Sequence, residues 1–160
     1  MSLLVVPTGD DMRALGERIG RECRGGDVLV LTGDLGAGKT TFTQGLARGL
    51  GVTEQVTSPT FVISRVHPND SGGPALVHVD AYRLGSVLEL DDLDLDADLQ
   101  ESVVVVEWGG GIAERLSPVR LGVLIRRSDD DGDDQRTVEL DSVGERWAPA
   151  VAAISEAWSS

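Results

Sequence analysis

The apolar positions of this chain include short uninterrupted runs that have the length of β-strands. These runs lie at 3–6, 27–33 and 102–108. Two further strands are expected at 60–67 and 75–82, joined by the turn-forming segment PNDSGGP; an acidic turn, SDDDGDD, separates a last pair at 119–127 and 136–140. An apolar run without alternation is typical of a strand covered on both faces, so 27–33 is predicted to lie in the centre of a sheet.

Other segments carry apolar residues at helical spacing. Three helices are expected, over 10–25, 39–50 and about 145–158. The repeating positions are Met12, Leu15 and Ile19 in the first helix and Phe42, Leu46 and Leu50 in the second. Glycines at 25–26 and at 51 are placed to end these two helices. The Asp/Leu-rich segment 87–101 is expected to be a loop with a short helix, and Pro118 to cut short a helix that starts after 108.

Strands that alternate with helices in the first half predict an α/β fold with parallel strand pairing. The pair at 119–127 and 136–140 has the form of a hairpin, which adds an antiparallel edge. Neither an internal repeat nor a linker divides the 160 residues, a length typical of one domain. We therefore expect a single domain over residues 1–160, with a mixed, mostly parallel sheet flanked by helices.

The composition of the chain limits the classes of function and the cellular location that are expected. The 27 acidic and 14 basic residues give a formal charge of −13, a field that repels phosphate backbones and disfavours direct binding of nucleic acid. The same charge is equally compatible with simple solubility and with a basic partner surface. Cys23 is the single cysteine, in step with the apolar face of the first helix, so we expect a buried thiol and a reducing compartment. No apolar run approaches the roughly eighteen residues of a membrane span, so a cytoplasmic protein is expected.

The segment GDLGAGKT, residues 33–40, fits the phosphate-binding pattern G-x-x-x-x-G-K-[ST] at every fixed position. Its glycines allow the backbone to turn its N–H groups toward phosphate oxygens, and the helix that follows directs its positive end at the same anion. Lys39 is the single lysine beside thirteen arginines. A compact ammonium suits this tight loop, whereas the broad guanidinium of arginine does not. The pattern predicts a P-loop nucleoside triphosphate site with Mg²⁺ on Thr40.

Hydrolysis also requires carboxylates near the phosphates, and two of them end apolar strands. Asp80 follows ALVHV and Glu107 follows SVVVV, where a parallel sheet places its ligand crevice. Strand-end solvation is the alternative for each of them. The segment TSPTF at 57–61 has the position of a switch that senses the γ-phosphate, or of an ordinary loop. The guanine-reading pattern Asn-Lys-x-Asp needs a second lysine, so ATP is favoured over GTP.

Four ordered motifs, GDLGAGKTTF, TSPTF, HVDAYRL and VEWGG, resemble the TsaE (YjeE) family, the bacterial ATPase subunit of the tRNA threonylcarbamoyladenosine machinery. The resemblance covers roughly residues 8–110, and the part of the chain after 111 has little of the family pattern. It implies a compact P-loop fold and Mg²⁺-dependent hydrolysis of ATP. It also implies assembly with two other subunits, which modify adenosine 37 of tRNAs reading ANN codons, so that tRNA is contacted indirectly and no membrane is involved.

The resemblance assigns roles to individual residues. The phosphates would be held by Gly33, Gly36, Ala37, Gly38, Lys39, Thr40 and Thr41. Mg²⁺ would be bound by Thr40 and Glu107, and the catalytic set would be Lys39, Asp80 and Glu107, with Asp80 beside the attacking water. The remaining nucleotide contacts would be Ser58 and Thr60 in the switch, Trp108 beside the site, and Thr8 and Gly9 near the adenine.

Two other functions fit parts of the sequence. A small-molecule P-loop kinase has a similar length, and Arg126 and Arg127 are candidates for the arginines of its lid, although they fall in an expected strand. A nucleotide-binding regulator without hydrolysis would leave Asp80 and Glu107 idle. Measured ATP turnover, with and without acceptors, separates these alternatives from an ATPase.

Overall fold

The computed structural model describes residues 2–33, 38–53, 64–69, 71–80, 101–107, 119–127 and 135–159. The helices are α1 (Gly9–Glu22), α2 (Lys39–Leu50) and α5 (Ala148–Ser159). The strands are β1 (Ser2–Val6), β2 (Val28–Gly33), β3 (Ser64–His67), β4 (Ala75–Asp80), β5 (Ser102–Glu107), β6 (Arg120–Arg127) and β7 (Arg136–Val143). Among the described helices, none is long and apolar enough to cross a bilayer.

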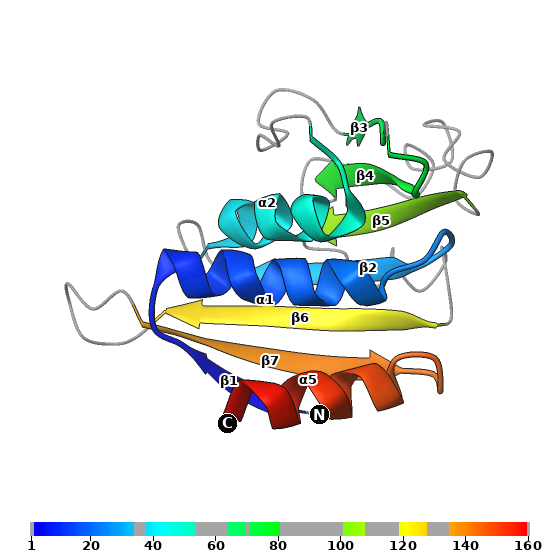
Figure 1. The fold of residues 1–160 in the computed structure, drawn as a ribbon. Helices are drawn as coiled ribbons and strands as arrows, with labels where there is room; N and C mark the ends of the chain where they lie inside the picture. The colour runs from blue at the N-terminus through cyan, green and yellow to red at the C-terminus, as the bar shows by residue number, and fades with distance from the viewer. Residues whose placement is uncertain are drawn as a thin grey trace.

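All described strands belong to one seven-stranded sheet in the order β1-β7-β6-β2-β5-β4-β3 (Figure 1). Strand β2 lies between β5 and β6 and is parallel to both, and β4 continues the parallel set beside β5. Antiparallel pairs complete the two edges, β3 with β4 on one side and β6 with β7 and β7 with β1 on the other. Because β1 is antiparallel to β7, which is itself antiparallel to β6, β1 also runs in the direction of the central strands. The predicted α/β class with a mixed, largely parallel sheet is confirmed.

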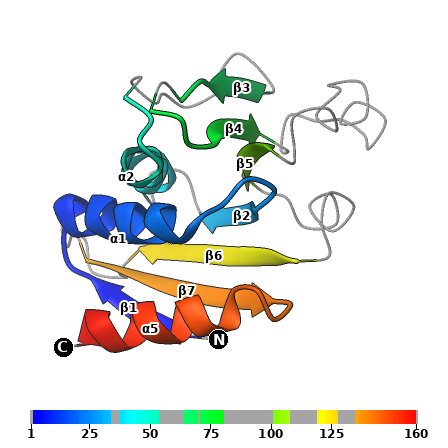
Figure 2. The ribbon, with the colours of Figure 1, turned by 45° about the vertical axis from the view of Figure 1, so that its right-hand side comes forward.

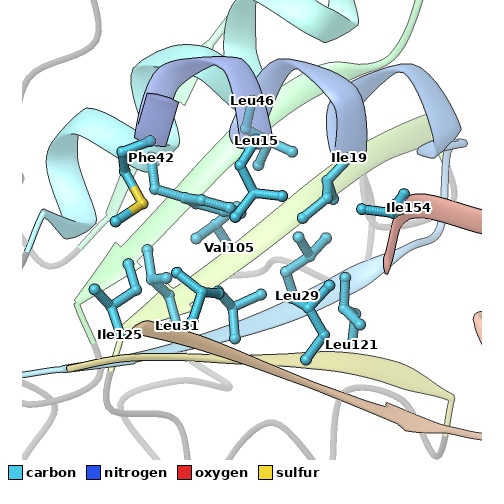
Figure 3. Packing of buried hydrophobic residues seen from close by; sticks show 14 of the residues in the cluster. Leu15, Ile19, Leu29, Leu31, Phe42, Leu46, Val105, Leu121, Ile125 and Ile154 are labelled. Carbon is cyan, nitrogen blue, oxygen red and sulfur yellow. The ribbon is translucent and has the colours of Figure 1, made fainter. Parts of the chain in front are cut away.

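The described helices cover one face of this sheet. In Figures 1 and 2, α1 and α2 lie over the central strands and α5 lies over β1 and β7. The core forms between this helical layer and the alternate strand residues that face it (Figure 3). Its members include Leu15, Ile19, Phe42, Leu46 and Ile154 from the helices and Leu29, Leu31, Val105, Leu121 and Ile125 from the strands. Removing these apolar side chains from water, at roughly 25 cal/mol per Å² of apolar area, holds the helices against the sheet.

Glycines bring α1 and α2 into backbone contact. A Cβ atom added to Gly16 would clash with the carbonyl oxygen of Phe42, and one added to Gly20 would clash with that of Leu46. On the facing helix, a Cβ at Gly45 would clash with the carbonyl oxygen of Arg13. Contacts therefore advance along both helices in the same direction, so α1 and α2 are parallel and their N-terminal ends lie at the same edge of the sheet.

Most of the expected elements are present, with some differences at their ends. The first helix ends at Glu22 rather than at Gly25–Gly26, because Cys23 already has an extended backbone, and Gly26, at φ 96°, turns the chain into β2. Gly51 ends α2 as predicted, at φ 93°. The last strand continues beyond 140 to Val143, and α5 begins at Ala148 rather than near 145. Predictions for 60–63, 87–100 and 108–118 lie outside the described residues.

Candidate functional site

The predicted phosphate-binding segment joins a central strand to the helix that follows it. Gly33 ends β2, and α2 begins at Lys39 with Gly38 as its N-terminal cap. Gly38 has φ 115°, a left-handed conformation that L side chains rarely adopt, so glycine is strongly favoured here. Without a side chain, Gly38 cannot cap the helix, and no acidic residue lies in the first turn of α2. The first N–H groups and the positive end of the helix dipole are thus available to an anion.

The residues expected to contact phosphate and cation lie in that first turn. Lys39, Thr40 and Thr41 are all half-buried. Thr43, one turn further along, is fully buried, and its hydroxyl donates to the carbonyl of Lys39 at 2.8 Å. The Thr43 hydroxyl is therefore engaged within the helix. The hydroxyls of Thr40 and Thr41 lie nearest the beginning of α2. Four predicted contacts, Gly36, Ala37, Ser58 and Thr60, lie outside the described residues, as does Trp108.

Thr8 and Gly9, predicted to lie near the adenine, form the entrance to α1. Thr8 caps this helix: its hydroxyl oxygen accepts a hydrogen bond from the backbone N–H of Asp11 at 3.1 Å. The same hydroxyl donates to the carboxylate of Asp11 at 2.7 Å. Nothing lies within 4 Å of a Cβ built on Gly9, so the backbone there is open on its outer side. Since α1 and α2 are parallel, this entrance lies at the same edge of the sheet as Lys39.

The two predicted carboxylates end neighbouring parallel strands. Glu107, the last residue of β5, is in register with Asp80 at the end of β4 on one side and with Leu31 of β2 on the other. Leu31 precedes Gly33 by two residues, so Glu107 lies next to the strand that leads into the phosphate-binding segment. Glu107 is 6% exposed. A carboxylate this deeply buried needs hydrogen-bond or cation partners, because removing one unpaired ion from water costs on the order of several kcal/mol.

His78 of β4 supplies one of those partners. Its Nε2 atom lies 3.0 Å from Oε1 of Glu107, and both side chains are buried. His78 lies within the motif HVDAYRL, and no role was predicted for it from the sequence. The available signal was the alternation along β4: His78 stands two residues before Asp80, on the same face of the strand, with Leu76 and Val79 among its apolar neighbours.

The arginines considered for a kinase lid lie in regular structure. Arg126 and Arg127 are the last two residues of β6, paired in register with Thr137 and Arg136 of β7. The Arg126 guanidinium lies 3.8 Å from the carboxylate of Glu139 on the same strand pair. Both arginines are held in the antiparallel ladder of β6 and β7, as the expected strand implied. They therefore do not lie on a mobile segment of the kind that forms a kinase lid.

Cys23 follows the last residue of α1 and packs against the core while remaining partly exposed. Burial raises the pKa of its thiol, and the charge of Asp27 raises it further. A protonated thiol is a poor nucleophile and a poor metal ligand. Cys23 is thus partly buried rather than fully buried as expected, and it lies just beyond the helix rather than within its apolar face.

The geometry agrees with comparisons to known proteins. The family model of "Threonylcarbamoyl adenosine biosynthesis protein TsaE" matches residues 6–138. A Streptomyces coelicolor protein named "tRNA threonylcarbamoyladenosine biosynthesis protein TsaE" is 54% identical over 145 residues, 89% of this chain and 98% of that protein. Proteins of the same name from Mycobacterium tuberculosis (50% identical, 76% of this chain, 77% of that protein) and Bacillus subtilis (43%, 86% and 84%) are also similar.

A solved structure gives the same result in three dimensions. The crystal structure of Bacillus subtilis YdiB superposes with a TM-score of 0.75 at 35% identity, covering 97% of this chain and 94% of that one. The family model extends past residue 110, where the motifs used in the sequence comparison end, through β6 and into β7. From the sequence matches and this shared fold, we conclude that the chain belongs to the TsaE family.

Proposed function

We propose that this chain is a Mg²⁺-dependent ATPase that acts in the threonylcarbamoylation of adenosine 37 in tRNAs reading ANN codons. The place in tRNA modification is proposed from the names of its relatives, among them proteins that match it at 43–54% identity. The ATPase activity follows from the chain's own residues. It rests above all on one observation: the N-terminus of α2 has neither a side-chain cap nor an acidic first turn, and it carries the single lysine.

The phosphate groups are held by the backbone of this segment. In the proposal, the N–H groups from Gly33 to Thr41 surround the triphosphate, and Lys39 neutralises its β- and γ-phosphates. Gly36 and Ala37 belong to the same loop, and Gly38 permits the left-handed turn. Thr8 and Gly9 lie at the same edge through the parallel packing of α1 on α2, which supports a place for them beside the adenine.

The residues at this edge fit a hard cation. Mg²⁺ takes oxygen ligands, commonly one or two protein groups together with phosphate oxygens and water. The Glu107 carboxylate and the Thr40 hydroxyl supply such oxygens from the end of β5 and the start of α2. The bound cation would neutralise charge on the phosphates. Asp80, in register with Glu107, is proposed to orient the attacking water, and Ser58 and Thr60 to sense the γ-phosphate, with Trp108 beside them.

We propose that this ATPase works in the cytoplasm together with the two other subunits of the machinery, the threonylcarbamoyl transferase and its paralogous partner. The formal charge of −13 suits a chain that leaves the tRNA to its partners, because phosphate backbones are repelled from most of its surface. Turnover by the isolated chain is therefore expected to be slow, and to rise when the partner subunits are added.

The test is ATP turnover by the purified chain, with and without the candidate partner subunits and tRNA. Lys39→Ala and Glu107→Ala are expected to lower kcat/KM by at least a hundredfold, a change typical of the loss of one preorganised electrostatic contact. Retention of full turnover by Glu107→Ala would contradict the assignment. Phosphate transfer to a small acceptor, at a rate above hydrolysis, would instead favour a kinase.

A further inference from the structure

His78 is a polar side chain in the interior of an apolar strand. It is 0% exposed, and Leu76, Val77 and Val79 around it are buried as well. An imidazole removed from water needs partners for its ring nitrogens, because unpaired polar atoms are costly to bury. Nε2 has a partner in Oε1 of Glu107, whereas Nδ1 has none within the part of the chain that the structure describes. The ring is thus directed at one atom of one carboxylate.

The chemistry of the pair fixes which nitrogen carries the proton. A glutamate that binds a cation is ionised and can only accept hydrogen bonds. His78 must therefore donate from Nε2, and this assignment leaves a lone pair, rather than an N–H group, at the unpartnered Nδ1.

The strand register places this donor firmly. His78 is directly opposite Val105, two residues before the end of β5, so it reaches Glu107 along the diagonal of the parallel pair. Side chains at His78, Val105 and Glu107 share one face of the sheet, since residues two apart on a strand point the same way. The bond engages Oε1, and among the described residues no hydrogen bond to the second carboxylate oxygen, Oε2, competes with another ligand.

We propose that His78 is a positioning residue for the cation site: its Nε2–H group holds Oε1 of Glu107 so that Oε2 is presented to the Mg²⁺ bound with the nucleotide. This inference rests on the proposed function, because it assigns Glu107 to that cation. Partners that hydrogen-bond a metal-ligating carboxylate fix its orientation, and their loss typically lowers metal affinity or activity by about 10–100-fold. A histidine that merely satisfied a buried carboxylate would affect stability and leave the magnesium dependence unchanged.

Two amide substitutions separate these roles. In His78→Gln, the side-chain nitrogen can occupy the place of Nε2, so the hydrogen bond to Glu107 is kept. In His78→Asn, the nitrogen falls near the place of Nδ1, so the bond is lost while the polarity stays similar. The measurements are binding of a fluorescent ATP analogue and ATP turnover, each as a function of Mg²⁺ concentration, together with the melting temperature in EDTA.

We expect His78→Asn to raise the Mg²⁺ concentration for half-maximal binding and turnover by about 10–100-fold. His78→Gln should stay much closer to the wild-type value. Nucleotide binding in EDTA should be the same for both variants, because the change acts through the cation. In a Glu107→Gln background, His78→Asn should have no further effect on the Mg²⁺ dependence. His67→Asn, the same change at another fully buried strand histidine, in register with Leu76, should leave that dependence unaltered.

Several results would overturn the inference. One is a wild-type Mg²⁺ dependence in His78→Asn; another is an equal shift in His78→Gln and His78→Asn. A His78→Gln chain that failed to fold would also overturn it, because the retained donor would then not suffice. If the wild-type chain itself showed no Mg²⁺-dependent nucleotide binding, the proposed function would fail first and the inference with it, which distinguishes the two failures.

Discussion

Helices α1 and α2 lie side by side and run in the same direction (Figure 1). Their N-terminal ends are nevertheless built in opposite ways. The first turn of α1 is closed by its own side chains: Thr8 caps it, and Asp10 and Asp11 supply two negative charges. The first turn of α2 begins at a glycine with no side-chain cap and contains no acid. Within the described residues, the same edge of the sheet therefore presents one helix end that is closed by its own side chains and one that has neither a side-chain cap nor an acid.

The difference shows how an acidic protein can hold an anion. Each helix N-terminus carries roughly half a positive charge, and two parallel helices bring two such ends together. Carboxylates offset the end of α1. The chain has 27 acidic residues but places none in the first turn of α2, where Lys39 adds a full positive charge. In the proposed function, local placement of charge, rather than the net charge of −13, would decide where the triphosphate binds.

Adding an acid to the N-terminal end of α2 should have the largest effect on nucleotide affinity. Gly38→Asp places a carboxylate at the cap of α2, where it competes with phosphate for the same N–H groups. Two unit charges about 4 Å apart interact by about 4 kcal/mol near a protein surface, so nucleotide affinity should fall by about a thousandfold. Isothermal titration with MgATP measures this loss.

Gly38→Asn is the matched control, because asparagine has the size of aspartate, lacks its charge and tolerates the left-handed backbone better than most residues. It should lose far less affinity than Gly38→Asp. Equal affinities for these two variants would mean that charge at this helix end does not govern binding, and the contrast between α1 and α2 would lose its functional meaning.

A smaller effect is expected from separating the two helices. In Gly45→Ala, the added methyl group would overlap the carbonyl oxygen of Arg13 on α1, and backbone cannot move aside as a flexible side chain can. Overpacking of this kind costs about 1–3 kcal/mol of unfolding free energy. Urea denaturation measures the loss. Gly122→Ala serves as control, since its Cβ would lie at an ordinary 3.5 Å from Asp141, and it should lose clearly less stability than Gly45→Ala.

Local sequence patterns were sufficient for part of this architecture. The run 27–33, the glycine-rich segment and the helix from Lys39 follow one another within 24 residues, so local patterns sufficed to predict β2 and α2. The nucleotide site expected between these elements stays a prediction. Asp80 and Glu107 were found at strand ends because carboxylates that close apolar runs stand out in sequence. Their register opposite each other follows from parallel pairing of β4 with β5.

Features that depend on distant pairing were not predicted. The bond from His78 to Glu107 joins residues 29 apart and requires the register of two strands, which no local pattern encodes. The pairing of β1 with β7 joins the two ends of the chain in the same way. The helices were predicted from the spacing of their large apolar residues, and glycines do not contribute to that pattern. The close approach of α1 and α2 was therefore not predicted either.

The smallest change concerns the cap of α1. Thr8→Ala removes the hydroxyl that accepts from the N–H of Asp11 and donates to its carboxylate, and loss of such a cap costs about 1 kcal/mol of unfolding free energy. Thr8→Ser keeps the hydroxyl and should retain most of that stability in urea denaturation. Because the hydroxyl is already engaged within α1, MgATP affinity should fall much less in Thr8→Ala than in Gly38→Asp. If Thr8→Ala instead left stability unchanged and weakened nucleotide binding as strongly as Gly38→Asp, Thr8 would serve the ligand rather than the helix, and the two N-termini would form one shared anion site.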